Sequence, residues 1–210
     1  MTHKRTNRAI LYGAGGIGVV LAEVLVDSGW GIDRVFDDAP GPGSQLHGVP
    51  VEPVPEPGPD DPEPASGVFN FVSIGKAEPR ERIVRSLEGA VFGTAVHPTA
   101  SVSPTAIIGE GSMVFHGSVV QARAKIGRHV IVNTAASIDH DCVIGDFSHI
   151  APQVALCGLV SVGARTEVGA GASVIPSVRI GDDCRIGAGA VVIRDVPDGS
   201  TVVGNPGRIV

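Results

Sequence analysis

Residues 126–150 read IGRHVIVNTAASIDHDCVIGDFSHI, and in this stretch every sixth residue is aliphatic. An α-helix repeats about every 3.6 residues and a strand about every two, so neither element explains a strict period of six. The spacing continues in both directions without a change of phase, through Val96, Val102, Ile108, Val114, Val120, Ile126, Val132, Ile138, Ile144, Ile150, Leu156, Val162, Val168, Val174, Ile180, Ile186 and Val192. A hexapeptide repeat of this kind predicts a parallel β-helix, in which each hexad forms one short strand and a turn.

The repeat also predicts which residues are neighbours. Three hexads complete one coil, so each residue should lie roughly 4.8 Å from the residues eighteen positions before and after it. The seventeen hexads then make between five and six coils around one narrow aliphatic core. We therefore expect a β-helix domain over residues 95–198, followed by a C-terminal tail over residues 199–210.

Composition narrows the possible partners. The 210 residues allow one or two domains, and the repeat occupies only the second half. A net charge of −6 without a basic run argues against nucleic acid and against an anionic membrane surface, and no apolar stretch reaches the roughly 18 residues that a membrane span needs. The three cysteines have no paired spacing, and Cys142 and Cys184 occupy the small interior position of their hexads. This pattern is typical of reduced thiols in a cytoplasmic protein.

Residues 1–94 differ in character and predict a small Rossmann-like α/β domain. The expected elements are a strand over 8–12, a helix ending near 28, a strand near 34–36, a strand over 68–74 and a helix around 79–87. These are too few strands for a full dinucleotide domain, so we expect a single nucleotide as the ligand. Residues 39–65 are dominated by Pro, Gly, Asp and Glu, and we expect a mobile surface loop without packed elements there.

A glycine motif marks the expected nucleotide site. Gly13, Gly15 and Gly18 form a G-x-G-x-x-G pattern between the first expected strand and its helix, and Asp37 and Asp38 follow about 20 residues on. Helix N-terminal amides and the absence of Cβ atoms suit such a turn to a phosphate group. A tight glycine turn without any ligand is the alternative.

The repeat is interrupted by polar residues that could carry chemistry, namely Asn133, Asp139, His140, Asp141 and His149. The expected stacking neighbours of His140 are Ala122 and Gly158, whose small size would leave open space around the imidazole. Flanking carboxylates would orient the ring and raise its basicity, as a general base needs. A surface histidine without a role is the alternative.

A metal site is not expected. Two ligands from one subunit would most simply lie multiples of eighteen residues apart, and no such spacing occurs among His97, His116, His129, His140 and His149. Cys157 is expected beside Asp139 and offers an alternative reading as an acyl-accepting nucleophile, but it has no base at a known spacing.

The chain resembles the hexapeptide-repeat sugar acyltransferases in segments that follow the family's order: YGAGGIG, VFDD, SIGKAEPRERI, HPTASVSPTAIIGEGSMV, VNTAASIDHDCVIGDFSHIAP and VVGNPGRIV. It is most similar to the UDP-4-amino-4,6-dideoxysugar N-acetyltransferases of the bacillosamine type, whose relatives act on GDP-perosamine or O-acetylate sialic acid. The resemblance implies a left-handed β-helix, contrary to the usual right-handed crossover. It also implies a homotrimer with active sites between neighbouring subunits.

The resemblance further implies residue roles. The catalytic base and its supporting carboxylate would be His140 and Asp141, with Asp139 and Asn133 as accessory residues. Acetyl-CoA would contact His149 and the backbone near Ala170 and Ala188, with the C-terminal tail nearby. The nucleotide of the sugar would be held by Gly13, Gly15, Gly16, Asp37, Asp38 and Gly75. The chain departs from the family where Asp139 and Asp141 replace a longer Glu, and where the segment after Asp38 is longer.

These observations together predict an acetyl-CoA-dependent N-acetyltransferase that acts directly on the amine of a nucleotide-linked amino sugar. The alternatives are an O-acetyltransferase with the same site and a non-catalytic nucleotide-binding scaffold protein. An NAD oxidoreductase would need a second substrate domain. The identity of the sugar, the nucleotide base and the length of the acyl group stay open.

Overall fold

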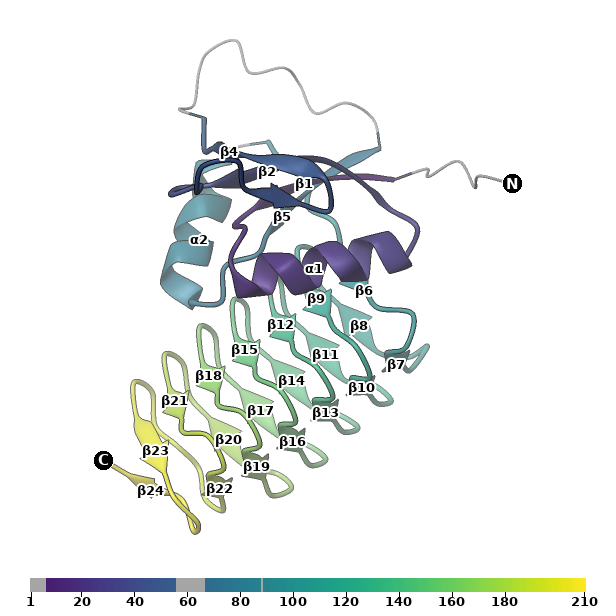
Figure 1. Ribbon diagram of the computed structural model, residues 1–210. Helices are drawn as coiled ribbons and strands as arrows, with labels where there is room; N and C mark the ends of the chain where they lie inside the picture. The colour runs from purple at the N-terminus through teal and green to yellow at the C-terminus, as the bar shows by residue number, and fades with distance from the viewer. Residues whose placement is uncertain (1–6, 56–66, 88) are drawn as a thin grey trace. The chain divides into compact units, whose positions relative to one another are not determined.

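The computed structural model describes residues 7–55, 67–87 and 89–210, and the chain divides into two units, Met1–Pro98 and Thr99–Val210. The first unit contains the elements β1 (Arg8–Tyr12), α1 (Gly16–Asp27), β2 (Gly31–Asp37), β3 (Gln45–Leu46), β4 (Val49–Pro53), β5 (Val68–Val72), α2 (Ala77–Ser86) and β6 (Ala95–Val96). Its sheet has the order β3-β4-β2-β1-β5, with β4, β2, β1 and β5 parallel (Figure 1). The predicted Rossmann-like arrangement is confirmed.

The prediction of no packed element between residues 39 and 65 was wrong for residues 45–53. Strands β3 and β4 form a hairpin there, and β4 extends the sheet by pairing with β2. The turn residues His47 and Gly48 have φ values of 49° and 78°, the geometry that matches the twist of a two-residue hairpin. The proline-rich composition of residues 39–65 predicted a loop, although His47-Gly48 within it forms a hairpin turn. Residues 39–44 and 54–55 contain no helix or strand, and residues 56–65 of the expected loop lie outside the described residues.

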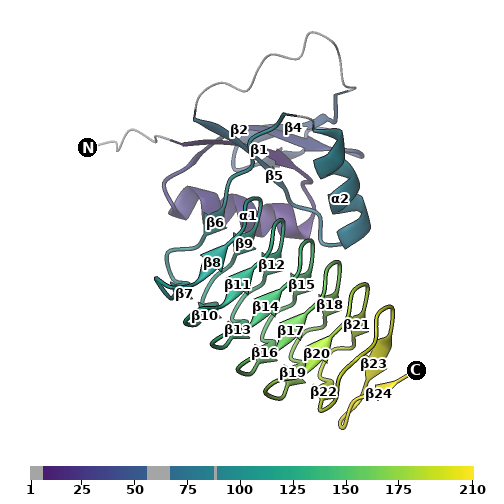
Figure 2. The same ribbon diagram turned by 180° about the vertical axis from the view of Figure 1, so that it is seen from behind.

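The second unit is the predicted left-handed β-helix, and its short parallel strands form three faces (Figures 1 and 2). The first face contains β9 (Met113–Val114), β12 (Ile131–Val132), β15 (His149–Ile150), β18 (Glu167–Val168), β21 (Arg185–Ile186), β23 (Thr201–Val203) and β24 (Arg208–Ile209). The second face contains β7 (Ser101–Val102), β10 (Val119–Val120), β13 (Ser137–Ile138), β16 (Ala155–Leu156), β19 (Ser173–Val174) and β22 (Val191–Val192). The third face contains β8 (Ile107–Ile108), β11 (Lys125–Ile126), β14 (Val143–Ile144), β17 (Ser161–Val162) and β20 (Arg179–Ile180).

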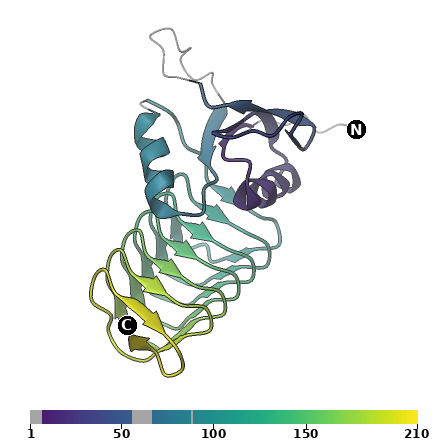
Figure 3. The same ribbon diagram turned by 60° about the vertical axis from the view of Figure 1, so that its left-hand side comes forward.

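The register confirms the expected offset of eighteen residues. Ser137 pairs with Ala155, and Ile131 pairs with His149. At the C-terminal end the offset falls to sixteen, since Arg185 pairs with Thr201. There β24 folds back antiparallel to β23, as Figure 3 shows.

The core of this unit is the aliphatic column that the repeat predicts. From Val114 to Val192, each residue of the series is at most 2% exposed. Burying one such side chain stabilises the fold by about 1.5–3 kcal/mol, so the column supplies the main driving force for the coils.

The turns of the second unit hold many non-glycine residues in the left-handed region. From Arg123 to Arg165, every sixth residue has a φ between 54° and 65°. This backbone costs roughly 1–2 kcal/mol per residue, so the surrounding hydrogen bonds must enforce it. Asp141, for example, donates its N–H to the carbonyl oxygen of Ala122 at 3.0 Å, and Leu159 donates to that of His140 at 3.0 Å. The backbone on either side of His140 is therefore fixed by the coils before and after it.

Within the described ranges, no helix is long and apolar enough to cross a membrane.

Candidate active site

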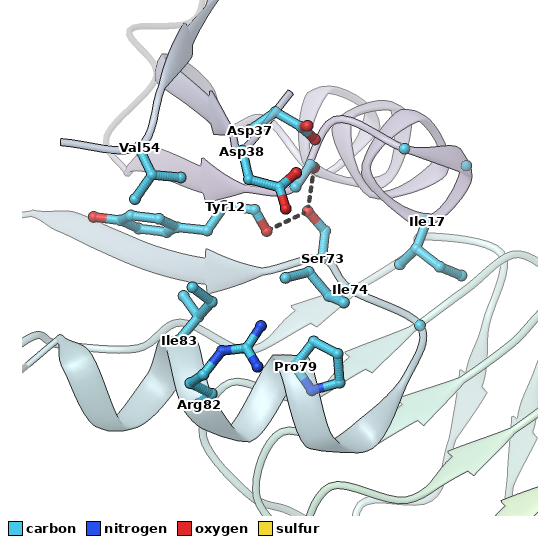
Figure 4. Close-up of a pocket in the computed structure, with 14 residues that line it drawn as sticks. Tyr12, Ile17, Asp37, Asp38, Val54, Ser73, Ile74, Pro79, Arg82 and Ile83 are labelled. Atoms are coloured by element: carbon cyan, nitrogen blue, oxygen red, sulfur yellow. Dashed lines mark hydrogen bonds between the residues drawn. The ribbon is translucent and has the colours of Figure 1, made fainter. Parts of the chain in front are cut away.

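A cavity lies at the carboxyl ends of β1, β2 and β5 in the first unit. The strand order places β1 between the other two, and open α/β sheets bind ligands where connections leave a strand toward opposite sides. Its volume of about 430 Å³ lies within the range of small-molecule sites. The lining residues are Tyr12, Gly13, Gly15, Gly16, Ile17, Asp37, Asp38, Val54, Ser73, Ile74, Gly75, Pro79, Arg82 and Ile83 (Figure 4). The structure therefore brings together all six residues that the sequence assigned to a nucleotide.

The glycine loop at this cavity (residues 13–18) is fixed by its backbone conformation and by a hydrogen bond to Asp37. Gly13 has a φ of +110°, which favours glycine, and a Cβ at Gly18 would collide with the Gly13 carbonyl oxygen. The Asp37 carboxylate accepts the Ala14 N–H at 2.7 Å. That hydrogen bond is the main cause that lowers the pKa of Asp37. Asp37 therefore orders the loop itself, with its charge kept beside the cavity.

Helix α2 contributes two arginines that the sequence did not single out. Arg80 is fully buried and donates from Nη1 to the carbonyl oxygens of Ile74 and Gly75, which fixes the loop after β5. Arg82 lines the cavity, and Figure 4 shows its side chain rising from α2 toward it. The sequence signal that could have identified Arg82 is the helical spacing of Pro79, Arg82 and Ile83, which places the three residues on one face of the helix. Arg82 supplies a cation where an anionic ligand would lie.

In the second unit, His140 lies in the turn between β13 and β14, at the edge that joins the second and third faces (the second edge). Its ring packs against Gly158, where an added Cβ would lie 2.7 Å from both Cε1 and Nε2. The small neighbour is thus confirmed, but the space beside it is filled by the imidazole and is not open. The histidine side chain is 51% exposed, so its outer edge can meet a substrate.

The carboxylates of Asp139 and Asp141, on either side of His140, contact different parts of that residue. Asp141 Oδ2 lies 2.8 Å from Nδ1 of the His140 ring. Asp139 Oδ1 accepts the backbone N–H of His140 at 2.7 Å. Asp141 orients the imidazole, whereas Asp139 orients the main chain that carries it.

Arg123 is a functional candidate that the sequence reasoning missed. Its Nε and Nη2 atoms lie 2.7 Å from Oδ1 and Oδ2 of Asp141, respectively, in a two-pronged ion pair. Arg123 and Asp141 are eighteen residues apart, so the coil offset could have identified them as neighbours. This ion pair is the largest cause that holds the pKa of Asp141 well below its usual range, and the contact with His140 is the next. The carboxylate therefore stays ionised beside the imidazole.

The residues expected to bind acetyl-CoA lie elsewhere on the same unit. Ala170 and Ala188 occupy turns at the edge between the first and second faces (the first edge), and His149 lies on β15 of the first face. Asn133, expected as an accessory residue beside His140, also lies at the first edge and contacts His149 instead. Asn133 Nδ2 lies 3.1 Å from His149 Nε2. Ala170 and Ala188 are exposed and stacked, since Gly189 donates its N–H to the Ala170 carbonyl oxygen at 2.9 Å. Within one chain, the width of the second face separates this group from His140.

The cysteines give little support to covalent catalysis. Cys142 and Cys184 are buried as expected, and burial raises the pKa of the Cys142 thiol. Cys157 is half-buried, and its carbonyl oxygen accepts the Cys142 thiol at 3.2 Å. In the described part of the chain, no hydrogen bond joins the Cys157 thiol to a histidine.

Comparison with known proteins adds to this geometry. Residues 160–194 match the family model described as bacterial transferase hexapeptide (six repeats). The GDP-perosamine N-acetyltransferase of Escherichia coli O157:H7 is 35% identical over 147 residues, which cover 67% of this chain. The match spans just under two thirds of that relative, 66% of its length.

Solved structures match over nearly the whole chain. PerB from Caulobacter crescentus, in complex with CoA and GDP-perosamine, is 37% identical with a TM-score of 0.87, and 97% of each chain is covered. The acetyltransferase domain of PglB from Neisseria gonorrhoeae FA1090 is 33% identical with a TM-score of 0.86, covering 97% of this chain and 100% of that one. The Caulobacter enzyme was also solved with CoA and GDP-perosamine after one histidine was replaced by alanine.

Proposed function

This chain belongs to the hexapeptide-repeat sugar acyltransferases, and on that premise we propose that it transfers an acetyl group from acetyl-CoA to the amine of a nucleotide-linked amino sugar. The observation that carries the proposal is the His140–Asp141 pair, with Nδ1 and Oδ2 2.8 Å apart at the exposed second edge. Similarity over 97% of the chain to a protein solved with CoA and GDP-perosamine supports the same assignment.

His140 is the proposed general base. An ionised Asp141 accepts a hydrogen bond from Nδ1–H, which leaves the lone pair of Nε2 to take a proton from the sugar amine. As the amine nitrogen bonds to the thioester carbonyl carbon, Nε2 receives the proton. When the carbon–sulfur bond breaks, the resulting imidazolium returns the proton to the departing thiolate. Every bond and proton is then accounted for without a covalent enzyme intermediate.

The cavity of the first unit is the proposed nucleotide site. The backbone amides of the glycine loop and the cation of Arg82 suit the diphosphate, and the carboxylates of Asp37 and Asp38 suit donors on the ribose or the base. The charges on the cavity wall thus match a nucleoside diphosphate sugar.

Filling this cavity should weaken sugar binding. Gly16→Leu should weaken the binding of nucleotide sugars at least about tenfold, since a Cβ at Gly16 meets no atom within 4 Å and the new side chain would occupy the cavity. Gly41→Leu is the matched control, since Gly41 has equally open space but does not line the cavity. Titration calorimetry should show unchanged acetyl-CoA binding in both variants. A Gly16→Leu protein that binds the sugar like the parent would refute this location.

We also propose a homotrimer. The first residues of the strands on the second face are all uncharged, namely Ser101, Val119, Ser137, Ala155, Ser173 and Val191. Association through such faces brings the first edge of one subunit toward the second edge of its neighbour, and a closed cyclic assembly satisfies each subunit equally. The separation of His149 from His140 within one chain supports a site completed by a second copy.

Mixing two impaired variants tests this shared site. His140→Ala and His149→Ala, each measured at low acetyl-CoA concentration, should be weakly active alone. After unfolding and refolding together, roughly a quarter of the sites should combine an intact His140 with an intact neighbour, and activity should recover. Each variant refolded alone is the control. Activity that never exceeds the average of the two separate preparations would place each site within one chain.

The overall assignment is tested by supplying UDP-, GDP- and dTDP-linked 4-amino sugars with acetyl-CoA and following the release of free thiol. An amide product that resists mild base supports N-acetylation, and a base-labile ester would indicate O-acetylation instead. Binding of nucleotide sugars without thiol release would favour a scaffold protein. The three unpaired cysteines support a cytoplasmic setting for this reaction.

A further inference from the structure

The Asp141 carboxylate has two partners that compete for one oxygen. Arg123 engages both carboxylate oxygens, with Nε 2.7 Å from Oδ1 and Nη2 2.7 Å from Oδ2. Oδ2 is also the atom that lies 2.8 Å from Nδ1 of His140. A single oxygen therefore links a guanidinium from one coil to an imidazole from the next.

This ion pair fixes the plane of the carboxylate. Two parallel N–H···O bonds from one guanidinium allow one orientation of the group they bind, whereas an aspartate with a single partner can rotate about χ2. The aspartate side chain is short, so its reach to Nδ1 depends on that orientation. The positive-φ backbone at Arg123 and Asp141, with φ of 60° at both, holds the two side chains in stacked turns.

The same ion pair sets the electrostatic surroundings of His140. The charged or titratable groups at the neighbouring positions are Asp139 and Asp141 on its own coil, Arg123 on the preceding coil and Cys157 on the following coil. The Arg123 cation offsets part of the Asp141 charge beside the imidazole ring.

We propose that Arg123 is a positioning residue for the reaction: it orients Asp141 so that Nδ1 of His140 carries the hydrogen and Nε2 is the basic atom. The kinetic part of this inference rests on the proposed acetyl transfer. The structural part, the choice of hydrogen-bearing nitrogen, does not depend on any activity.

The fold supplies a matched control. Arg165 binds Asp183 at the edge between the third and first faces, with Nε–Oδ1 and Nη2–Oδ2 distances of 2.7 Å each, and both residues again have positive φ, 55° and 54°. This ion pair has the same spacing and geometry, and within the described residues Asp183 has no hydrogen bond to a histidine. Arg165→Gln removes the same type of bridge as Arg123→Gln.

In kinetics, Arg123→Gln should lower kcat by roughly 10-fold to 100-fold with little change in KM for either substrate, since orientation and not binding is lost. Arg123→Lys keeps the charge but not the two-pronged geometry, so it should recover only part of kcat. Arg165→Gln should match the parent in kcat and in the KM for each substrate.

Nitrogen-15 NMR of the ring, assigned with His140→Ala, gives a readout independent of turnover. The parent should show the hydrogen on Nδ1, and Arg123→Gln should show a mixture of the two forms. Arg123 is 65% exposed, so these variants should fold. A parental ring spectrum in Arg123→Gln would overturn the proposal. If the parent itself transfers no acetyl group, the proposed function fails, while the NMR result still decides the role of Arg123.

Discussion

Replacing His140 with alanine should lower kcat by about 10²–10⁴-fold, while acetyl-CoA affinity changes no more than a few-fold. A base acts in the transition state, so its loss raises the barrier without removing a ground-state contact with the co-substrate. Single-turnover and steady-state measurements with the best amino-sugar substrate would give kcat, and titration calorimetry would give the affinity.

Two further variants serve as controls. His149→Ala should weaken acetyl-CoA binding more than it slows chemistry, because His149 lies with Asn133 away from the second edge. The loss of kcat in Asp141→Asn should fall between those in His140→Ala and His149→Ala, since asparagine keeps the shape of the side chain but removes the charge that favours the imidazolium. The melting temperature of His140→Ala should barely change, since the side chain is half exposed. Near-full turnover of His140→Ala with every accepted sugar would rule out His140 as the base.

The β-helix was predictable because its period of six is imposed by burial. A hexad places its aliphatic residue inside the coil, and hydrogen bonding between coils then requires an offset of eighteen. That offset correctly identified Gly158 as a neighbour of His140. Arg123 escaped notice because exposed turn positions accept almost any polar residue, so the hexad pattern alone does not distinguish an ion pair from two solvated charges.

The first unit was predictable in outline for a different reason. Glycines and paired aspartates at strand ends mark the cavity, because parallel strands meet at one edge of a sheet. The β3–β4 hairpin was missed because its turn is set by two residues, His47 and Gly48, within a proline-rich segment. Arg82 was missed because a charged residue on a short helix is usually solvated, and only the fold shows that α2 faces the cavity.

Enlarging Gly158 gives the second large effect. An alanine Cβ at this position would lie 2.7 Å from Cε1 and Nε2 of His140, closer than real Cβ atoms approach, and 3.3 Å from Cδ2. The backbone of this turn is fixed between coils, whereas the half-exposed imidazole can rotate toward solvent. The ring would then lose Nδ1–Oδ2 contact with Asp141. Gly158→Ala should therefore lower kcat roughly 100-fold or more, with only a small change in melting temperature.

A double-variant cycle shows whether the effect passes through the imidazole. In a His140→Ala background the ring is absent, so Gly158→Ala should lower kcat no further, and the two substitutions should be strongly non-additive. The cycle needs kcat for the parent, both single variants and the double variant under the same saturating conditions. If Gly158→Ala lowers kcat by the same factor in both backgrounds, the substitution acts on another part of the site. If it leaves the parental kcat unchanged, the ring position seen against Gly158 is not the one that carries out the reaction.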